Sequence, residues 1–424
     1  MPIGQFRGGY RGIQATSHIS FSRTIVPIGR IFRPEDYGTP TGTDSTIDMP
    51  LVQSAINSAV SAGGGTVRLE RTYAYTHSGN QTTLGPYRNR DYGFWVNGSN
   101  IAIDGNGTGI LKIVGLPTFT NSYIGFLVGN GGYTGIYPGW DAVEVTGTWT
   151  ENVSIKNLSF DNSLLTDANL STLTGGVISS CLLLAFCRNC EIDGITIDRG
   201  WGITGAISTH CSSILNAVRN CDIALSQRVA YWFDGTENST FDDLTCNSFL
   251  DTTNANGLTI AINTDYSHGS ARNTVKNCRL AGVHTGIGVG GEDNIVENNT
   301  ITVISNNTTH VGVSVGALAN IKGKWAGMRS IIRNNNFVRD TSDGPRGFGV
   351  QLNGINANAY DGLPLESADA NVYGNTFGSQ LGQALVLGPQ ANRNTFQHNT
   401  INCATEVFDN SGGTAVGNVI GPNP

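Results

Sequence analysis

One short phrase recurs along this chain and constrains its fold more than any other feature. The phrase reads apolar, any residue, polar, Asn or Cys, any residue, apolar, as in Val275-Lys276-Asn277-Cys278-Arg279-Leu280. Further copies begin at Val218, Val296, Ile332, Val372 and Phe396. The spacing between copies varies, as expected of stacked coils whose loops differ in length on one face of a solenoid. The phrase therefore predicts a repeat protein with one continuous core.

A second segment between copies alternates strictly between apolar and small or polar residues. Val311–Gly316 and Phe348–Asn353 are examples. This period of two is typical of a strand with one buried face. Every copy reads in the same direction, so neighbouring coils pair in parallel. Together these patterns predict an all-β fold, a right-handed parallel β-helix.

Composition and charge narrow the function classes. The 424 residues include 56 Gly, and 39% are hydrophobic against 13% charged, which excludes both a disordered chain and a helical one. The net charge is −7, with no basic run, so nucleic acid is not an expected partner. No apolar run reaches transmembrane length, so no membrane association is expected. The first residues lack the layout of a signal peptide.

The cysteines fall in the same slot of the phrase as asparagines. Cys221, Cys246 and Cys278 are expected to stack at one turn, in line with Asn299, as buried thiols without disulfides. The same column is expected to continue through Asn336, Asn375, Asn399 and Asn418. Strands one coil apart lie about 4.8 Å from each other, so identical side chains form ladders. Cys181, Cys187, Cys190 and Cys211 have zinc-like spacing, but strand packing explains them better and no metal site is predicted.

The N-terminal third predicts a cap over the first coil. Asp48 is expected to cap a helix over residues 50–62, which ends at three glycines, and such a helix would cover the open edge of the stack. Residues 1–34 are expected to form an extension and residues 35–424 a single β-helix domain.

The same stretch carries a family resemblance. Asp36-Tyr37-Gly38, Gln53-Ser54-Ala55-Ile56 and Gly63-Gly64-Gly65-Thr66-Val67 resemble the opening of the pectate-lyase-like β-helix superfamily. That group includes polygalacturonase-type glycosidases, polysaccharide lyases and phage tailspike depolymerases. The resemblance implies a polysaccharide substrate. Asn263-Thr264-Asp265 also looks like the polygalacturonase element whose Asp acts as acid, but the later Gly-His-Gly and Arg-x-Lys elements are missing.

An alignment of the alternating strands brings polar residues together. It places Ile207, Ile262, Val289, Val315 and Leu352 in one buried column, so that Ser208, Asp234, Asn263, Gly290, Gly316 and Asn353 form the next, outward column. The glycines leave room for a ligand. Asp265 and Glu292 lie a few residues further along their coils, so acidic side chains are expected to gather over neighbouring coils.

This clustering predicts a glycoside hydrolase with paired carboxylates. The expected catalytic residues are Asp265, Asp234 and Glu292, since one or two coil steps give the carboxylate separations that hydrolysis requires. The expected substrate-binding residues are His210, Glu237, Asn263, His268, Asp293, Trp232 and Tyr266. No cofactor is predicted.

Three alternatives stay open. Acids followed by glycine or aspartate are also ordinary turn residues, and core packing is the alternative for Trp232 or Phe233, since alternation lets only one of the two face outward. A polysaccharide lyase would need a base and often Ca²⁺, and a tailspike or adhesin could bind glycan without cleaving it. We expect an extracellular or phage-virion location and a homotrimer or another side-by-side oligomer.

Overall fold

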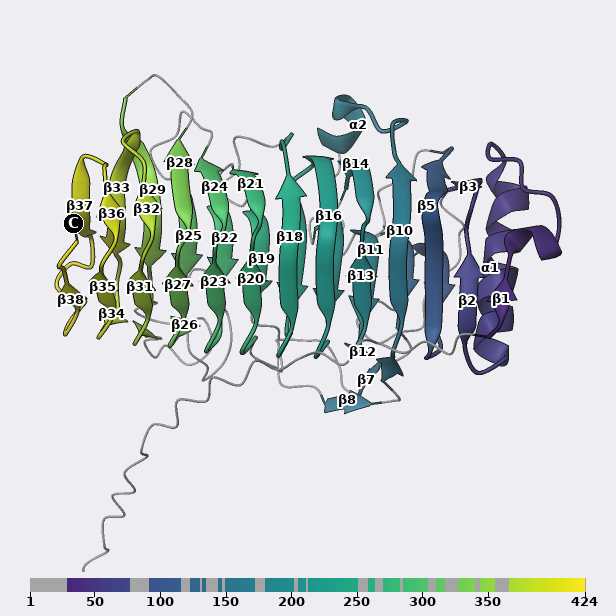
Figure 1. Cartoon of the computed structure of the whole chain (residues 1–424), viewed down its shortest axis with the longest axis horizontal. Coiled ribbons are helices and arrows are strands. Elements are labelled where there is room, and N and C mark those ends of the chain that lie inside the picture. The colour runs from purple at the N-terminus through teal and green to yellow at the C-terminus, as the bar shows by residue number, and fades with distance from the viewer. Residues whose placement is uncertain are drawn as a thin grey trace, which may run out of the picture.

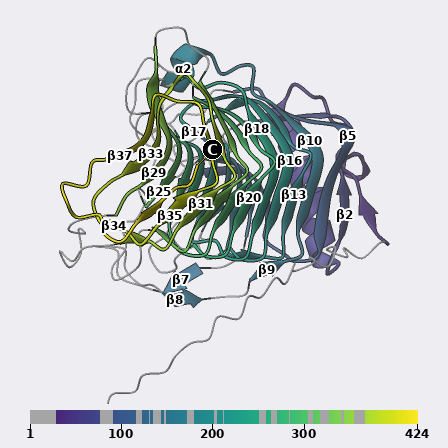
Figure 2. The same ribbon diagram turned by 60° about the vertical axis from the view of Figure 1, so that its left-hand side comes forward.

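The computed structural model describes most of the chain, apart from the N-terminus and several loops. The described residues are 29–76, 91–115, 123–129, 132–134, 144–146, 149–171, 180–201, 205–210, 213–250, 258–263, 270–282, 285–303, 310–316, 327–339, 344–354 and 366–423. They form a right-handed parallel β-helix, in which coils stack along one long axis from α1 at one end to the C-terminal coil at the other (Figures 1 and 2). The predicted fold is confirmed.

Two large parallel sheets run the length of the stack, and we call them sheet A and sheet B. Sheet B receives one strand from each coil: β4 (Asp91–Val96), β6 (Tyr123–Val128), β11 (Ser180–Ala185), β15 (Ile207–His210), β17 (Val229–Asp234), β19 (Leu258–Asn263), β22 (Thr285–Val289), β25 (Val311–Val315), β29 (Arg346–Leu352), β33 (Leu381–Leu387) and β37 (Thr405–Asp409).

Sheet A is bent, and most coils cross it with two short strands or one long one. Its strands are β1 (Ile31–Phe32), β2 (Gly65–Arg68), β3 (Thr72–Tyr75), β5 (Ile101–Ile113), β10 (Ser154–Asp161), β13 (Glu191–Asp193), β14 (Thr196–Gly200), β16 (Ala217–Ser226), β18 (Thr240–Cys246), β20 (Thr274–Lys276), β21 (Arg279–Gly282), β23 (Ile295–Glu297), β24 (Thr300–Val303), β27 (Ile331–Arg333), β28 (Asn336–Arg339), β31 (Asn371–Tyr373), β32 (Thr376–Phe377), β35 (Thr395–Gln397), β36 (Thr400–Ile401) and β38 (Val419–Ile420).

A narrow strip of very short strands and single bridges joins the end of sheet B to the start of sheet A. We call it the corner strip, and its strands are β9 (Thr150–Glu151), β12 (Cys187–Arg188), β26 (Gly327–Met328), β30 (Ser367–Ala368) and β34 (Ala391–Asn392). The antiparallel pair β7 (Gly132–Thr134) and β8 (Glu144–Thr146) and the short helix α2 (Asp167–Ser171) lie outside the stack of coils (Figure 1). No helix in the described ranges is long and apolar enough to cross a membrane.

The core lies between the two sheets and is built from columns of matching side chains. Phe337 and Phe377 stack with ring centroids 4.9 Å apart and planes within 10° of parallel. Gly312 and Gly349 on sheet B face these rings, and an added Cβ at either glycine would lie 2.4 Å or less from a ring carbon. The aromatic stack therefore requires glycine at these two positions.

A ladder of asparagines, buried except for the terminal Asn423, follows the bend in sheet A. Its members are Asn299, Asn335, Asn375, Asn399 and Asn423, each linked to the next by a hydrogen bond from the backbone N–H to the following Oδ1. The predicted ladder exists, but two of its members were wrong. Asn336 is exposed beside Asn335, and Asn418 belongs to a second ladder at the corner strip, where it accepts from Asn394.

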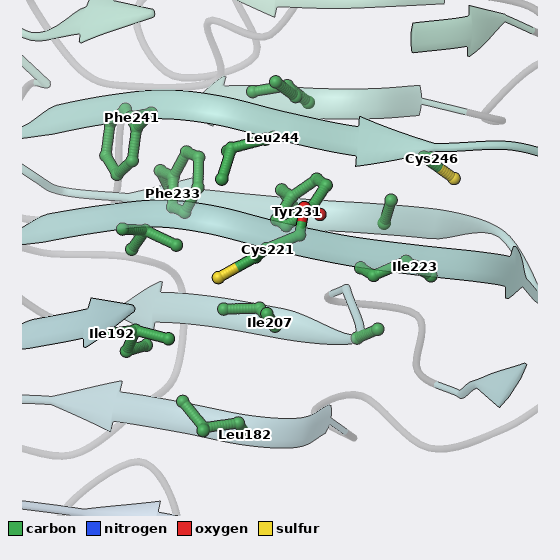
Figure 3. Packing of buried hydrophobic residues seen from close by; sticks show 14 of the residues in the cluster. Leu182, Ile192, Ile207, Cys221, Ile223, Tyr231, Phe233, Phe241, Leu244 and Cys246 are labelled. Carbon is green, nitrogen blue, oxygen red and sulfur yellow. Dashed lines mark hydrogen bonds between the residues drawn. The ribbon is translucent and has the colours of Figure 1, made fainter. Parts of the chain in front are cut away.

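The cysteine column is confirmed for two of its three members. Cys278 donates its backbone N–H to Asn299 Oδ1, and Cys221 lies in the same column with Leu244 between them. Cys246 instead lies two residues further along its strand, between Ile223 and Leu280, so its predicted place was wrong. Figure 3 shows Cys221 and Cys246 at different points along their strands. Both face the core, and the cysteines in the described residues are all free thiols.

The N-terminal cap is longer than the sequence suggested. Helix α1 covers Ser45–Ser61 with Asp44 as its N-cap, so Pro50 lies inside it and Asp48 in its first turn. Asp48 is fully buried and accepts hydrogen bonds from the backbone N–H groups of Thr41, Gly42 and Ala74 at 2.6–2.8 Å. Its role is therefore to join the helix to the first coil, whereas Asp44 satisfies the helix terminus.

Candidate functional site

The ends of three neighbouring strands in sheet B bring predicted site residues together. Asp234 at the end of β17 pairs in register with Asn263 at the end of β19. Thr209 pairs with Phe233, which puts His210 beside Asp234 on the preceding coil. The backbone register thus places His210, Asp234 and Asn263 at matching positions on consecutive coils, whose strands lie about 4.8 Å apart.

This arrangement corrects the predicted register by two residues. Ile207 lies in the column of Tyr231 and Ile260, while Thr209 occupies the column of Phe233 and Ile262. Ser208 therefore flanks Trp232, and His210 takes the place beside Asp234 that the alignment gave to Ser208. The error arose because both residue pairs have the same inward and outward alternation, which a shift by two residues preserves.

Trp232 lies on the outer face of the same strands. Its neighbours Tyr231 and Phe233 are fully buried in the core, whereas Trp232 is half-buried and pairs in register with Ser208 and Ala261. Its Nε1 has no hydrogen-bond partner within the part of the chain that the structure describes. The residues in its row on the next coils, Ala261, Gly288 and Ser314, are all small. Ser208 and Ser314 in this row are buried, so packing against the surrounding chain accounts for Trp232 as well as stacking on a sugar ring does.

Glu237, Glu292 and Asp293 lie elsewhere, in the corner strip. Parallel bridges connect Glu237 to Ala271 and Ala271 to Glu292, so these acids form a column separate from the ends of β17 and β19. Arg272 contacts Glu237 at 2.7 Å, and Arg329 contacts Glu292 at 2.8 Å and Asp293 at 2.7 Å. Hydrogen bonds to Asp293 and Glu292 raise the pKa of Arg329 above its ordinary value. In this structure the three acids serve as ion-pair partners.

The remaining predicted residues, Asp265, Tyr266 and His268, lie outside the described residues. Asn263, the last residue of β19, precedes Asp265 by two positions in the sequence. The catalytic role of Asp265 stays a prediction.

One further pair of carboxylates lies on adjacent coils and was not predicted from the sequence. Asp161 and Asp198 follow the paired residues Phe160 and Ile197 of β10 and β14. Burial raises the pKa of Asp198, although the backbone N–H groups of Asn162 and Arg199 donate to it at 2.7 Å. Burial acts the same way on Asp161, but hydrogen bonds from Ser163 and the nearby Lys112 lower its pKa overall.

This pair joins a carboxyl group with a raised pKa to one with a lowered pKa, as acid–base chemistry requires. Each of the two also organises a local turn, which is a sufficient reason for its presence. Each acid directly follows a weaker copy of the recurring phrase, Ile155–Phe160 or Ile192–Ile197, so an alignment of these two copies could have placed them side by side.

Within the described residues, no group of three or more His, Cys, Asp or Glu side chains has the arrangement to hold a metal ion. Cys187 and Cys190 are buried, and each donates a weak hydrogen bond to a backbone carbonyl. Burial raises the pKa of Cys187 well above its ordinary value, so this thiol is protonated at neutral pH.

Comparison with known proteins shows similarity at the level of structure alone. No family model matches the chain, and no curated protein matches it. Among solved structures, the tailspike protein of E. coli bacteriophage HK620 in complex with pentasaccharide aligns with a TM-score of 0.62 and 16% sequence identity. A double mutant of that tailspike, also in complex with pentasaccharide, aligns with a TM-score of 0.63 and 16% identity.

Each alignment covers 92% of this chain and 67% of the tailspike chain. At this identity the likeness concerns the fold. The chain therefore shares the parallel β-helix fold of a phage tailspike protein over nearly its whole length.

Proposed function

We propose that this protein binds a polysaccharide along the outer face of sheet B and hydrolyses it with Asp234 and Asp265 as the paired carboxylates. The observation that carries the proposal is the row His210, Asp234 and Asn263 at the ends of adjacent strands, with Trp232 on the same face of β17. The fold is also that of tailspike proteins solved with a bound pentasaccharide. Glu292, the third candidate, is less suited because Arg329 already holds its carboxylate.

The outer face of sheet B favours an uncharged glycan. Beyond Trp232, the register aligns Ala261, Gly288, Ser314, Gln351 and Val386, none of which carries a charge. A β-elimination enzyme must neutralise the carboxylate of a uronate, for which a cation is needed on the binding face. The composition of this row supports hydrolysis over elimination.

Product analysis on a panel of neutral and uronate-containing polysaccharides tests the proposal. Mass spectrometry is expected to show oligosaccharides with one added water per cleavage, from a neutral polymer. Products with an unsaturated end would identify a lyase. Retention of a glycan without any product would identify a binding protein, such as a tailspike or adhesin that does not cleave.

We also propose a virion-associated or extracellular location and a side-by-side homotrimer. Light scattering at micromolar concentration is expected to give three times the mass of one chain. A monomer under these conditions would contradict the trimer and would leave the hydrolase proposal unchanged.

A further inference from the structure

A row of charged side chains on the outer face of sheet A alternates in sign from coil to coil. The register pairs each member with the next, beginning at β2 and ending at β27. In order the row reads Arg68, Asp104, Lys156, Asp193, Arg219, Asp242, Lys276, Glu297 and Arg333. The sign changes at every step without exception, although only 13% of the chain is charged. We call this row the charge ladder.

The corner strip repeats the same alternation beside the charge ladder. Residues with positive φ follow one another there as Asn238, Arg272, Asp293, Arg329, Asp369 and Arg393. Arg329 bonds to Asp293 and Arg393 bonds to Asp369, each reaching back to the preceding coil. Where both rows carry charge, a coil has the same sign in both, as with Arg272 and Lys276 or Asp293 and Glu297. On the three coils where both rows carry charge, the two rows therefore agree in sign.

The ion pairs alone do not account for this order. Arg219 lies 3.1 Å from Asp193, Lys276 lies 3.3 Å from Asp242, and Arg333 lies 2.6 Å from Glu297. All of these side chains are partly exposed, and such pairs contribute little to stability. If attraction within ion pairs were the only cause, separate pairs of opposite charges would be sufficient. The alternation in sign instead continues from each ion pair to the next, through every coil of the row.

Because the coils resemble one another, the apolar pattern alone does not determine which coil pairs with which. Val218, Phe241, Val275, Val296 and Ile332 follow one another in a single buried column, so each coil offers its neighbours an equivalent surface. A coil that skips its neighbour and pairs with the next one along would still bury its apolar residues. From Asn299 onward the asparagine ladder would also accept the skip, because its members are identical.

We infer that the charge ladder enforces the order of the coils by making every one-coil skip a contact between like charges. If β16 paired with β20 instead of β18, Arg219 would face Lys276. If β18 paired with β23, Asp242 would face Glu297. Like charges directly opposite each other on neighbouring strands are unfavourable. For skips from β20 onward the corner strip adds a second conflict of the same kind, as between Arg272 and Arg329.

An exchange of two neighbouring charges tests this inference on the full chain. Asp242→Lys combined with Lys276→Asp keeps the net charge and the opposite pair, but it places the new lysine beside Arg219 and the new aspartate beside Glu297. After dilution from denaturant in low salt, we expect the folding equilibrium constant to fall about tenfold and the refolding yield to fall with it. In about 1 M NaCl, where the Debye length is about 3 Å, both should recover.

Two control variants distinguish an effect of the alternation in sign from an effect of simply losing or adding a charge. Asp242→Asn with Lys276→Gln removes the pair without creating a like contact. Asn336→Lys adds a cation on sheet A between the uncharged Thr300 and Thr376. Both variants should have nearly the same folding equilibrium constant and refolding yield as the unmodified chain.

A rescue variant covers the case in which the exchanged protein does not fold at all. Adding Arg219→Gln and Glu297→Gln to the exchange removes both like contacts and should restore refolding. An exchange variant that refolds as well as the unmodified chain in low salt, or one that the rescue leaves unimproved, would overturn the inference.

Discussion

At the scale of single residues, we propose that Asp234 and Asp265 act on the substrate, whereas ion-paired carboxylates such as Glu292 and Asp293 hold the fold. Asp234→Asn and Asp265→Asn are each expected to lower turnover by about 10³-fold, because removal of a general acid or a nucleophile has effects of this size. Kinetic assays on the polysaccharide found by product analysis would measure the change. The midpoint of denaturant unfolding should stay almost constant.

The matched controls are Glu292→Gln and Asp198→Asn. Glu292 shares Arg329 with Asp293, so its loss should cost at most about 1 kcal/mol of stability and leave turnover intact. If instead Asp198→Asn removes activity and Asp234→Asn does not, the acid–base pair is Asp161 and Asp198, and the site lies at the end of β10 and β14.

The asparagine ladder gives a second prediction at this scale. Asn335 is buried; its Nδ2 donates to Val296 O and Asn375 Oδ1 at 3.0 Å, and its Oδ1 accepts from Asn299. Asn335→Ala leaves these buried groups without partners and should lower the free energy of unfolding by about 2–3 kcal/mol. Asn336→Ala, one residue away and exposed, should change it by less than about 0.5 kcal/mol. Equal effects of the two changes in urea unfolding would contradict the assigned ladder.

At the scale of elements, helix α1 closes the N-terminal end of the stack through polar contacts as well as apolar ones. Gln53 donates to Trp95 O at 2.9 Å and accepts from Trp95 N at 3.0 Å, so its amide takes the place of a neighbouring strand beside β4. Exposed strand edges invite association between molecules. The helix therefore protects both the core and the backbone of the first coil.

The buried Asp48 allows this cap to be tested. Asp48→Ala removes the acceptor for three backbone N–H groups and should cost about 3 kcal/mol, with increased aggregation as the first coil opens. Asp44→Ala removes only an exposed N-cap and should cost about 1 kcal/mol. Calorimetry with light scattering distinguishes the two. A smaller effect for Asp48→Ala than for Asp44→Ala would show that α1 is held by its apolar face alone.

The sequence predicted the elements well and their exact register poorly. The phrase around Val296 located sheet A, and the alternation around Val313 located sheet B, since both patterns follow directly from burial. Cys246 was misplaced because this coil carries Leu244 in the position of the phrase that Asn or Cys otherwise occupies, and Cys246 in the apolar position two residues later. Ile207 was misplaced because a shift by two residues keeps the same face buried.

The ion pairs could not be predicted because they join coils whose spacing varies. Nothing in the sequence indicates that Arg329 reaches back 37 residues to Glu292. The charge ladder, by contrast, was present in the second position of the recurring phrase, as Arg219, Lys276, Glu297 and Arg333. The alternation in sign could not be recognised from these four residues, because it also depends on Asp193 and Asp242, which lie in the coils where the phrase is least regular.

At the scale of the whole molecule, the buried thiols and phenols predict a loss of stability in alkali. Burial raises the pKa of Cys221 and of Cys278 to about 12, and it raises the pKa of Tyr231 above its ordinary value. In the unfolded chain these cysteines ionise near pH 9, so the unfolded state binds fewer protons between about pH 9 and pH 12. Stability should therefore be independent of these thiols below about pH 9 and fall above it.

Urea unfolding at a series of pH values measures this change. Cys221→Ala with Cys278→Ala should be less stable at neutral pH, where two buried side chains are truncated, and should show a shallower decline in alkali. An unchanged slope in the double variant would assign the alkaline transition to other groups.

The direction of the hydrogen bonds has a mechanical consequence. In both sheets and in the asparagine ladders, the bonds between coils run along the axis of the stack, and the two ends differ. A load that pushes on the ends presses coil against coil and is shared by every bond at each level. A load that pulls on the C-terminus acts on one coil at a time, because each coil is bonded to the coils on either side of it in the stack. The stack of coils should thus resist compression along its axis, whereas tension on the C-terminus should unfold the coils one after another.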